Sequence, residues 1–317
     1  MINPLQGWIP YKLTHTDTQP QCHWINTLNK PFTEPFFDET IMHCKSAFHK
    51  YFHSVSDLSL LEQWAEQQEE HVKPTAFIFH ISRCGSTLAS QLLGIDEQNI
   101  SLAEVPFFDD LLRLPYKNSS YSAKHAEQLF ITALKFYSQK RTGNESRLFI
   151  KTDSWHIFFY EQIRELYPDV PFILLYRSPD EVLYSHTKVR GMQAVPGIIE
   201  PQLFGFEPGE AFNPNLDEYT AKVLERYLTR YIEIAQKDKN VLLLNYNEGP
   251  MDMIQSIARF SKTIISNETF SEMQERSGYH SKRPGQVFAE EKTVNYPEFL
   301  SKAINLYKQV DTLRLSL

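Results

Sequence analysis

The stretch from Phe77 to Leu93 constrains the fold more than any other part of this sequence. It contains the run Ala76 to Ile81, which is short and apolar on both faces, as is typical of a buried parallel strand. A polar turn, Ser82 to Thr87, follows, and leucines then recur at helical spacing. A strand, a glycine-containing turn and a helix together aim unpaired backbone N–H groups at an anion. This stretch therefore predicts an anion site.

The turn differs from the phosphate loop of ATP-binding proteins. A Walker A motif needs Gly at position 80 and Lys at position 86, where this chain has His80 and Ser86. The only cation is Arg83, two residues before Gly85, and Ser86 and Thr87 supply hydroxyl donors. The turn thus favours a phosphate group other than that of ATP with magnesium. The alternative is that its serine and threonine only cap the helix.

Composition excludes several classes of protein. The 317 residues carry a net charge of −7, and 42% of them are hydrophobic, which favours a globular protein without a nucleic-acid partner. No apolar run approaches the ~20 residues that a membrane-spanning helix needs. The first residues lack the charged and apolar regions of a signal peptide. We therefore expect a cytoplasmic protein.

Cysteines and histidines provide no recognisable metal site or disulfide framework. Three cysteines are present, and they are too few and too scattered for a set of disulfides. Two of them lie beside histidines, in the doublets Cys22–His23 and His43–Cys44. Zinc ligands rarely stand next to each other in sequence. We expect no metal, and we interpret the doublets as core cysteines beside solvent-facing histidines.

The order of strands and helices predicts an α/β fold, doubly wound around a mainly parallel sheet with helices on both faces. Strands are expected at residues 76–81, 100–104, 147–153, 171–177 and 240–246. Helical patterns are expected at residues 37–68, 123–140, 155–167, 179 onward, 216–236, 250–260 and 297–313.

The remaining segments predict the domain organisation. Residues 1–40 are rich in proline and aromatic residues and are expected to be irregular or a small antiparallel element. We place a boundary near residue 73, which gives an N-terminal extension, residues 1–73, packed on a core domain, residues 74–317. The glycine- and proline-rich segment 189–215 is expected to be a lid or binding loop.

Charged side chains stand at the ends of three predicted strands. Glu104 ends the second strand, Lys151 and Asp153 the third, and Arg177 the fourth. Open parallel sheets bind ligands outside the carboxyl ends of their strands, so we expect these residues to face the phosphate turn. Arg177, with Ser185 eight residues later on the next helix, suits a phosphate monoester. The alternatives are solvated strand ends and a serine bonded to its own helix.

Together these motifs resemble those of the sulfotransferases that use 3′-phosphoadenylyl sulfate. SRCGSTL at 82–88 is similar to the family's 5′-phosphosulfate loop, and YRSPDEVLYS at 176–185 to its 3′-phosphate site. LLLNYNEGP at 242–250 and KRPG at 282–285 resemble two later loops, the second of which closes over the nucleotide. The resemblance covers about residues 75–290. It implies that the cofactor is bound by Arg83, Cys84, Gly85, Ser86, Thr87, Arg177, Ser185, Tyr246, Lys282, Arg283 and Gly285.

The resemblance also implies catalytic residues. Many cytosolic members of the family have Lys-Thr-His at the end of the third strand, with the histidine as base, whereas this chain has Lys151-Thr152-Asp153. Tyrosylprotein and some bacterial sulfotransferases instead place a glutamate about 19 residues after the loop glycine, and Glu104 has this spacing. Glu104 is therefore the first choice of base and Asp153 the second. Arg83 and Lys151 are expected to stabilise charge during transfer.

The resemblance implies in-line transfer of a sulfuryl group to a hydroxyl or amine of a small or peptidic acceptor, without a metal. Two other hypotheses stay open. One is a P-loop kinase or nucleotide hydrolase with an unusual loop, and the other is an inactive nucleotide-binding or scaffold protein. The sequence identifies neither the acceptor nor an oligomeric state.

Overall fold

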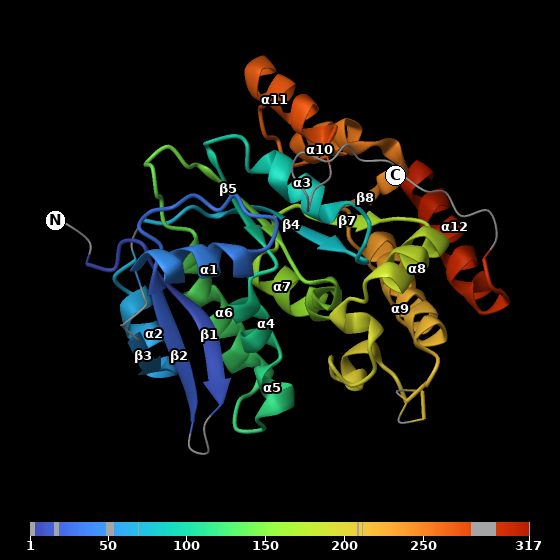
Figure 1. Cartoon of the computed structure of the whole chain (residues 1–317), viewed down its shortest axis with the longest axis horizontal. Helices are drawn as coiled ribbons and strands as arrows, with labels where there is room; N and C mark the ends of the chain where they lie inside the picture. The colour runs from blue at the N-terminus through green and yellow to red at the C-terminus, as the bar shows by residue number, and fades with distance from the viewer. Residues whose placement is uncertain are drawn as a thin grey trace. The chain divides into compact units, whose positions relative to one another are not determined.

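Figure 1 presents the structure, a computed structural model that describes residues 4–15, 19–48, 54–68, 70–207, 209–210, 212–279 and 296–316. It contains a three-stranded antiparallel sheet and a five-stranded sheet. In the part of the chain that the structure describes, no helix could cross a membrane.

The five-stranded sheet contains the five predicted strands. They are β4 (Pro74–His80), β5 (Asn99–Ala103), β6 (Arg147–Lys151), β7 (Phe172–Tyr176) and β8 (Val241–Asn245). Their order in the sheet is β5-β6-β4-β7-β8, and β5 with β6, β4 with β7, and β7 with β8 pair in parallel. Every residue of β5 and of β7 is buried, as expected for strands covered on both faces. The predicted α/β fold with a parallel sheet is confirmed.

By its internal contacts the chain divides into two compact units. The first comprises Met1–Thr75, Ser90–Lys151 and Gln162–Pro168, and the second comprises Ala76–Ala89, Thr152–Glu161 and Asp169–Leu317. The boundary expected near residue 73, between an extension and a core domain, stays a prediction.

The first unit contains the antiparallel sheet, whose strands are β1 (Trp8–His15), β2 (Pro20–Asn26) and β3 (Ser54–Asp57). The small antiparallel element expected near the N-terminus is therefore present. The helices that lie wholly in this unit are α1 (Phe37–Phe48), α2 (Leu58–Ala65), α4 (Pro106–Leu112), α5 (Leu114–Lys117) and α6 (Ala123–Tyr137). Helix α6 packs against α2, α4 and β1. Helix α7 (Tyr160–Leu166) has residues in both units.

The continuous helical pattern expected over residues 37–68 is wrong. Strand β3 separates α1 from α2, because Ser54–Asp57 alternates between half-buried and exposed residues and pairs with β2. Asp57 then caps α2 by accepting a hydrogen bond from the backbone N–H of Leu60. A four-residue strand carries too little periodicity to be seen in a sequence with helices on both sides.

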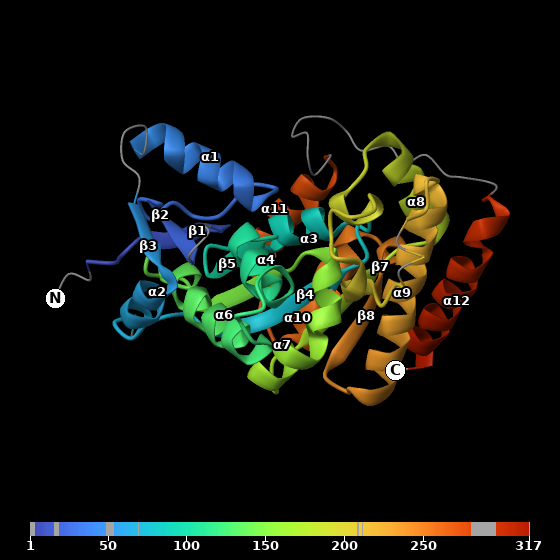
Figure 2. The same ribbon diagram turned by 90° about the horizontal axis from the view of Figure 1, so that it is seen from below.

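The second unit carries most of the C-terminal half of the chain. Its helices are η1 (Ser154–Phe159), α8 (Pro179–Lys188), η2 (Met192–Ala194), η3 (Pro201–Phe204), α9 (Leu216–Lys237), η4 (Tyr246–Glu248), α10 (Pro250–Phe260), α11 (Asn267–Ser277), η5 (Glu298–Leu300) and α12 (Ser301–Ser316). Helix α3 (Ser86–Leu93) begins in this unit. Helices α9 and α12 run side by side, and both contact β8 (Figures 1 and 2).

Two segments of this unit differ from expectation. The helix expected at 155–167 begins as the 3₁₀ turn η1, with Asp153 at its N-cap, and continues as α7. Helix α11 is missed in the sequence because only one of its residues, Met273, is buried, so it has no apolar stripe to detect. The described residues of the segment 189–215 include the short turns η2 and η3 and an isolated bridge between Pro196 and Ile199.

Candidate functional site

The turn after β4 has a backbone conformation that side chains other than glycine rarely adopt. Ser82, Arg83 and Gly85 have φ angles of 69°, 51° and 81°. A left-handed residue other than glycine costs on the order of 1–2 kcal/mol, and such residues persist where surrounding structure enforces them, often at functional sites. Of these three residues, Gly85 is the one whose residue type predicts a left-handed backbone from the sequence.

His80 fixes the start of this turn. Its Nδ1 accepts a hydrogen bond from the backbone N–H of Ser82 at 3.1 Å, and its Nε2 lies 2.9 Å from the carbonyl oxygen of Thr152. Because Nδ1 accepts, Nε2 carries the proton and donates it to the carbonyl. The ring is 4% exposed. His80 is thus a supporting residue of the turn, a role that its sequence position alone does not reveal.

Tyr246, at the end of β8, packs directly against the turn. A Cβ atom on Gly85 would lie 2.4 Å from Cδ2 and 2.5 Å from Cε2 of the Tyr246 ring. Only glycine can therefore stand at this position while the ring stays where it is. The second unit thus brings together two residues expected at the site, from positions far apart in sequence.

Arg177, at the end of β7, joins the same group. Its guanidinium lies 4.5 Å from the centre of the Tyr246 ring, and its Nη1 lies 3.4 Å from the carbonyl oxygen of Arg83. Its Nε donates to Oε2 of Glu181 at 3.1 Å. The sequence analysis missed Glu181 as a partner, although its spacing of four residues from Arg177 on a helix start was a signal.

The other residues of the turn have distinct surroundings. Nη2 of Arg83 donates at 2.6 Å to the carbonyl of Val189, just past the C-terminal end of α8, where helix carbonyls lack partners. Cys84 is fully buried, and its thiol lies 3.4 Å from the carbonyl oxygen of Leu175. The thiol therefore points into the core. Ser86 and Thr87 are buried in the first turn of α3, and Ser185 is half-buried on α8.

The first unit holds the pair Lys151 and Glu104. The Lys151 side chain is 0% exposed, and its Nζ lies 2.5 Å from Oε1 of Glu104, whose side chain is 24% exposed. The backbone N–H of Glu104 donates to the carbonyl of Lys151 at 2.8 Å. Glu104 has a left-handed φ of 53°. A buried lysine is thus matched by a carboxylate that also reaches solvent.

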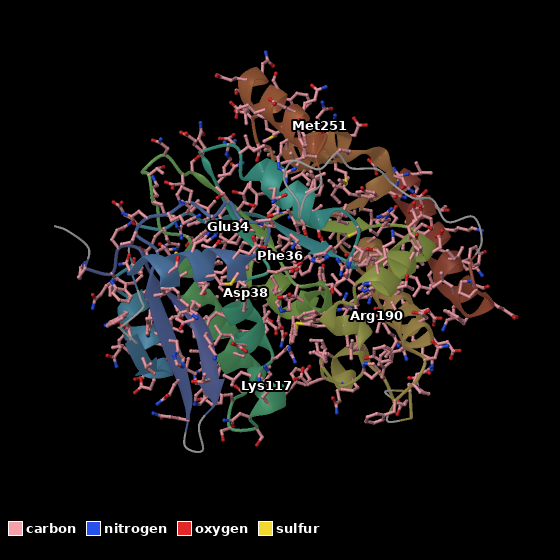
Figure 3. All side chains as sticks on the ribbon, in the orientation of Figure 1. Glu34, Phe36, Asp38, Lys117, Arg190 and Met251 are labelled. Carbon is pink, nitrogen blue, oxygen red and sulfur yellow. The ribbon has the colours of Figure 1, made fainter. Side chains whose placement is uncertain are left out.

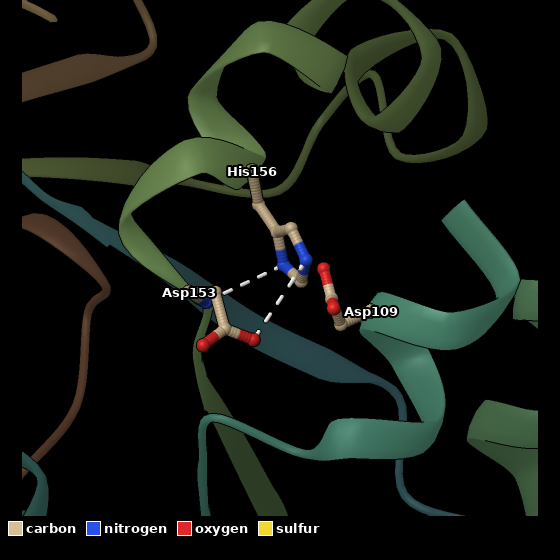
Figure 4. Close-up of side chains that lie close together, drawn as sticks. All are labelled: Asp109, Asp153 and His156. Atoms are coloured by element: carbon tan, nitrogen blue, oxygen red, sulfur yellow. Dashed lines mark hydrogen bonds and ion pairs between the residues drawn. The ribbon is translucent and has the colours of Figure 1, made fainter. Parts of the chain in front are cut away.

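Asp153, the second candidate base, caps a helix. Its side chain accepts from the backbone N–H of His156, while its own backbone N–H donates to His156 Nδ1 at 3.3 Å. Nε2 of His156 lies 3.8 Å from Oδ2 of Asp153 (Figure 4). Asp153 therefore has a structural function at the start of η1.

The two Cys–His doublets lie in the first unit. Cys22 is fully buried on β2, where burial raises the pKa of its thiol, and Nε2 of His23 lies 2.8 Å from a threonine hydroxyl. Burial likewise raises the pKa of Cys44, and Nδ1 of His43 lies 3.0 Å from Oε1 of Glu34, which Figure 3 labels. Each doublet thus combines a buried thiol with a histidine that has a protein partner.

Three of the expected cofactor-binding residues, Lys282, Arg283 and Gly285, lie outside the described residues. Within the second unit, the turn after β4 meets the ends of β7 and β8. The structure therefore defines an α/β protein with a strained polar turn at the carboxyl end of a parallel strand.

No protein-family model and no curated protein matches the chain. Its structure is similar to that of the sulfotransferase STF9 from Mycobacterium avium, with 14% identity over 82% of this chain and 80% of that one and a TM-score of 0.46. It is also similar to a sulfotransferase domain from the curacin biosynthetic pathway, with 15% identity, coverage of 76% and 99%, and a TM-score of 0.48. A third similar structure is the sulfotransferase domain of the Synechococcus olefin synthase, with 14% identity, coverage of 78% and 95%, and a TM-score of 0.45.

Proposed function

We propose that the protein is a sulfotransferase that moves a sulfuryl group from 3′-phosphoadenylyl sulfate to a hydroxyl or amine of an acceptor. The observation that carries the proposal is the meeting of Arg177 with the turn after β4, where its Nη1 lies 3.4 Å from the Arg83 carbonyl. A planar guanidinium with five donors beside the free N–H groups of a helix start suits a phosphate. Ser86 stands where a Walker lysine would be, which argues against ATP with magnesium.

The cofactor would contact the turn through Arg83, the Cys84 backbone, Gly85, Ser86 and Thr87. Its 3′-phosphate would lie with Arg177 and Ser185, and the Tyr246 ring would hold the Arg177 guanidinium in place by stacking. We retain Lys282, Arg283 and Gly285 as further contacts on the basis of the sequence alone.

Glu104 is the proposed base. Its side chain is 24% exposed, and its Oε1 lies 2.5 Å from the Nζ of the buried Lys151. Glu104 would take the proton of the acceptor hydroxyl or amine. At the same time the acceptor oxygen or nitrogen would bond to sulfur, and the bond between sulfur and the bridging phosphate oxygen would break. The electron pair of that bond leaves with the adenosine 3′,5′-bisphosphate product. Arg83 and the turn amides would stabilise the departing charge. Asp153, engaged as a helix cap, is the second choice.

Thermal unfolding with and without nucleotide tests the proposal. Adenosine 3′,5′-bisphosphate at 100 times its Kd should add about 2.7 kcal/mol to the free energy of unfolding, without metal. Arg177→Ala should abolish this gain. Arg226→Ala is the matched control. Like Arg177, Arg226 pairs with a carboxylate, that of Glu210, and lies over an aromatic ring, that of Phe206. Unlike Arg177, it does not follow a strand of the sheet in sequence.

Each other outcome identifies another function. Stabilisation only by ATP with magnesium would support the kinase or hydrolase hypothesis. Binding of the bisphosphate with no turnover of any acceptor class would support the inactive nucleotide-binding protein. Stabilisation by neither nucleotide would overturn the proposal.

A further inference from the structure

One carboxylate oxygen on the last helix gathers three hydrogen bonds. Oδ1 of Asp311, on α12, accepts from the Tyr176 hydroxyl at 2.7 Å, from Nδ2 of Asn245 at 2.9 Å and from Nε of Arg314 at 2.9 Å. The donors come from β7, from β8 and from α12 itself. Asp311 therefore links the C-terminal helix to two neighbouring strands of the sheet.

The two strand residues are the last of their strands. Tyr176 immediately precedes Arg177, and Asn245 immediately precedes Tyr246. Tyr176 is fully buried and Asn245 nearly so, so neither has water as an alternative partner. The hydrogen bonds that hold Tyr176 and Asn245 therefore also hold the backbone from which the side chains of Arg177 and Tyr246 extend.

Asn245 transmits this constraint into the turn that follows β8. Its Oδ1 accepts from the backbone N–H of Asn247 at 3.1 Å, and its Nδ2 donates both to Asp311 and to the Tyr307 hydroxyl at 2.9 Å. Its backbone N–H donates to Oε1 of Glu248 at 3.0 Å. With both donors and the acceptor of its amide assigned, Asn245 has one orientation.

The charge on Asp311 is part of this arrangement. Partial burial works against ionisation, but hydrogen bonds from Arg314, Asn245 and Tyr176 outweigh it and lower the pKa of Asp311. Arg314 also lies 3.1 Å from Glu248, so the same guanidinium reaches both α12 and the end of η4. Asp311 is thus ionised at neutral pH and acts as a common acceptor for the strand ends.

We propose that Asp311 is a positioning residue of the anion site, which holds the ends of β7 and β8 so that Arg177 stacks on Tyr246 beside the turn at Gly85. The geometric part of this inference is independent of the ligand, and only the choice of adenosine 3′,5′-bisphosphate as probe rests on the proposed function.

The test compares variants of Asp311 with a variant that loosens the same helix elsewhere. Asp311→Ala removes the acceptor, and Asp311→Asn keeps an oxygen but removes the charge. Ala303→Gly is the control, because Ala303 is fully buried in the first turn of α12, two turns before Asp311, and glycine removes its buried methyl group. Tyr176→Phe removes one donor without a change of shape.

Two measurements are made on each variant. We expect Asp311→Ala to weaken bisphosphate binding about tenfold in calorimetry, since a hydrogen bond to a charged group is worth about a factor of ten in an equilibrium constant. Hydrogen exchange of the unliganded protein should accelerate at residues 245–249 and 82–88. Asp311→Asn and Tyr176→Phe should give smaller changes of both, and Ala303→Gly should lose thermal stability without either change.

The outcomes separate this inference from the proposed function. Wild-type affinity and wild-type exchange at both segments in Asp311→Ala would overturn the positioning role. Equal changes in Ala303→Gly would also overturn it, because they would reflect general loss of stability. If the wild-type protein does not bind the bisphosphate but exchange responds to Asp311→Ala, the positioning role holds and the proposed function fails.

Discussion

Glu104 follows strand β5 and Asp153 follows strand β6, yet the two carboxylates are used differently. Asp153 accepts a backbone N–H of η1 and shares a capping box with His156. Glu104 has a left-handed backbone and faces the ammonium group of the buried Lys151. Glu104 thus has an energetically unfavourable backbone conformation after β5, whereas Asp153 provides a stabilising cap after β6.

This difference supports the proposal that Glu104, rather than Asp153, is the base. A carboxylate that satisfies backbone N–H groups lowers the free energy of the fold and needs no other reason to be present. A residue other than glycine with a left-handed backbone has an energetic cost, and residues with such a cost gather at functional sites. Three sets of variants test whether Glu104 and Asp153 have these different roles.

The largest effect is expected on turnover. Glu104→Gln should lower kcat by about 10²–10⁴-fold, the usual contribution of a general base, because the amide cannot take the acceptor's proton. Asp153→Asn should lower it less than tenfold, because an amide oxygen still accepts the capping hydrogen bond. Steady-state kinetics with any accepted acceptor measures both. Reversed effects would make Asp153 the base, and unchanged turnover in both would exclude both.

The next effect concerns stability. Glu104→Ala leaves the fully buried Lys151 ammonium without the carboxylate that faces it, and breaking a buried pair costs about 3–5 kcal/mol. Lys151→Met combined with Glu104→Ala should recover most of this loss, because no buried charge remains. Urea unfolding of the two single variants and the double variant gives the coupling energy. Additive losses would show that the two charges do not interact.

The smallest effect belongs to the cap. Asp153→Ala should lower the free energy of unfolding by about 1 kcal/mol through loss of the side-chain acceptor at η1. Asp153→Ser is the matched control, because a serine hydroxyl also accepts at this position and should retain most of the stability. Thermal unfolding distinguishes the two. Equal losses in both variants would mean that the charge of Asp153, rather than its acceptor, stabilises η1.

The sequence predicts the main sheet well because its strands are runs of apolar residues buried on both faces. Elements that form only through contacts with other parts of the fold, or that bury few residues, are harder to predict. Strand β3 exists because β2 lies beside it, and α11 buries only Met273. Neither leaves a clear periodic pattern in its own residues.

The sequence correctly predicts that Glu104, Lys151 and Arg177 stand at strand ends and that Arg83 and Gly85 stand in the turn after β4, because each follows a local pattern. That these residues bind a cofactor or catalyse a reaction stays a prediction. The supporting contacts were not predictable from the sequence. His80 supports Ser82 through a ring nitrogen, and Asp311 reaches Tyr176 across 135 residues of chain. Such contacts are decided by tertiary packing, which leaves no trace at fixed sequence spacing.

The close packing of Gly85 against Tyr246 has a consequence for how this protein can change over time. A Cβ at position 85 would lie 2.4 Å from the tyrosine ring, so the first substitution to arise there would be harmful on its own. A smaller residue at 246 would have to come first, and it would remove the ring that supports Arg177. Positions 85 and 246 are therefore expected to vary together among descendants of this chain, or to stay fixed together.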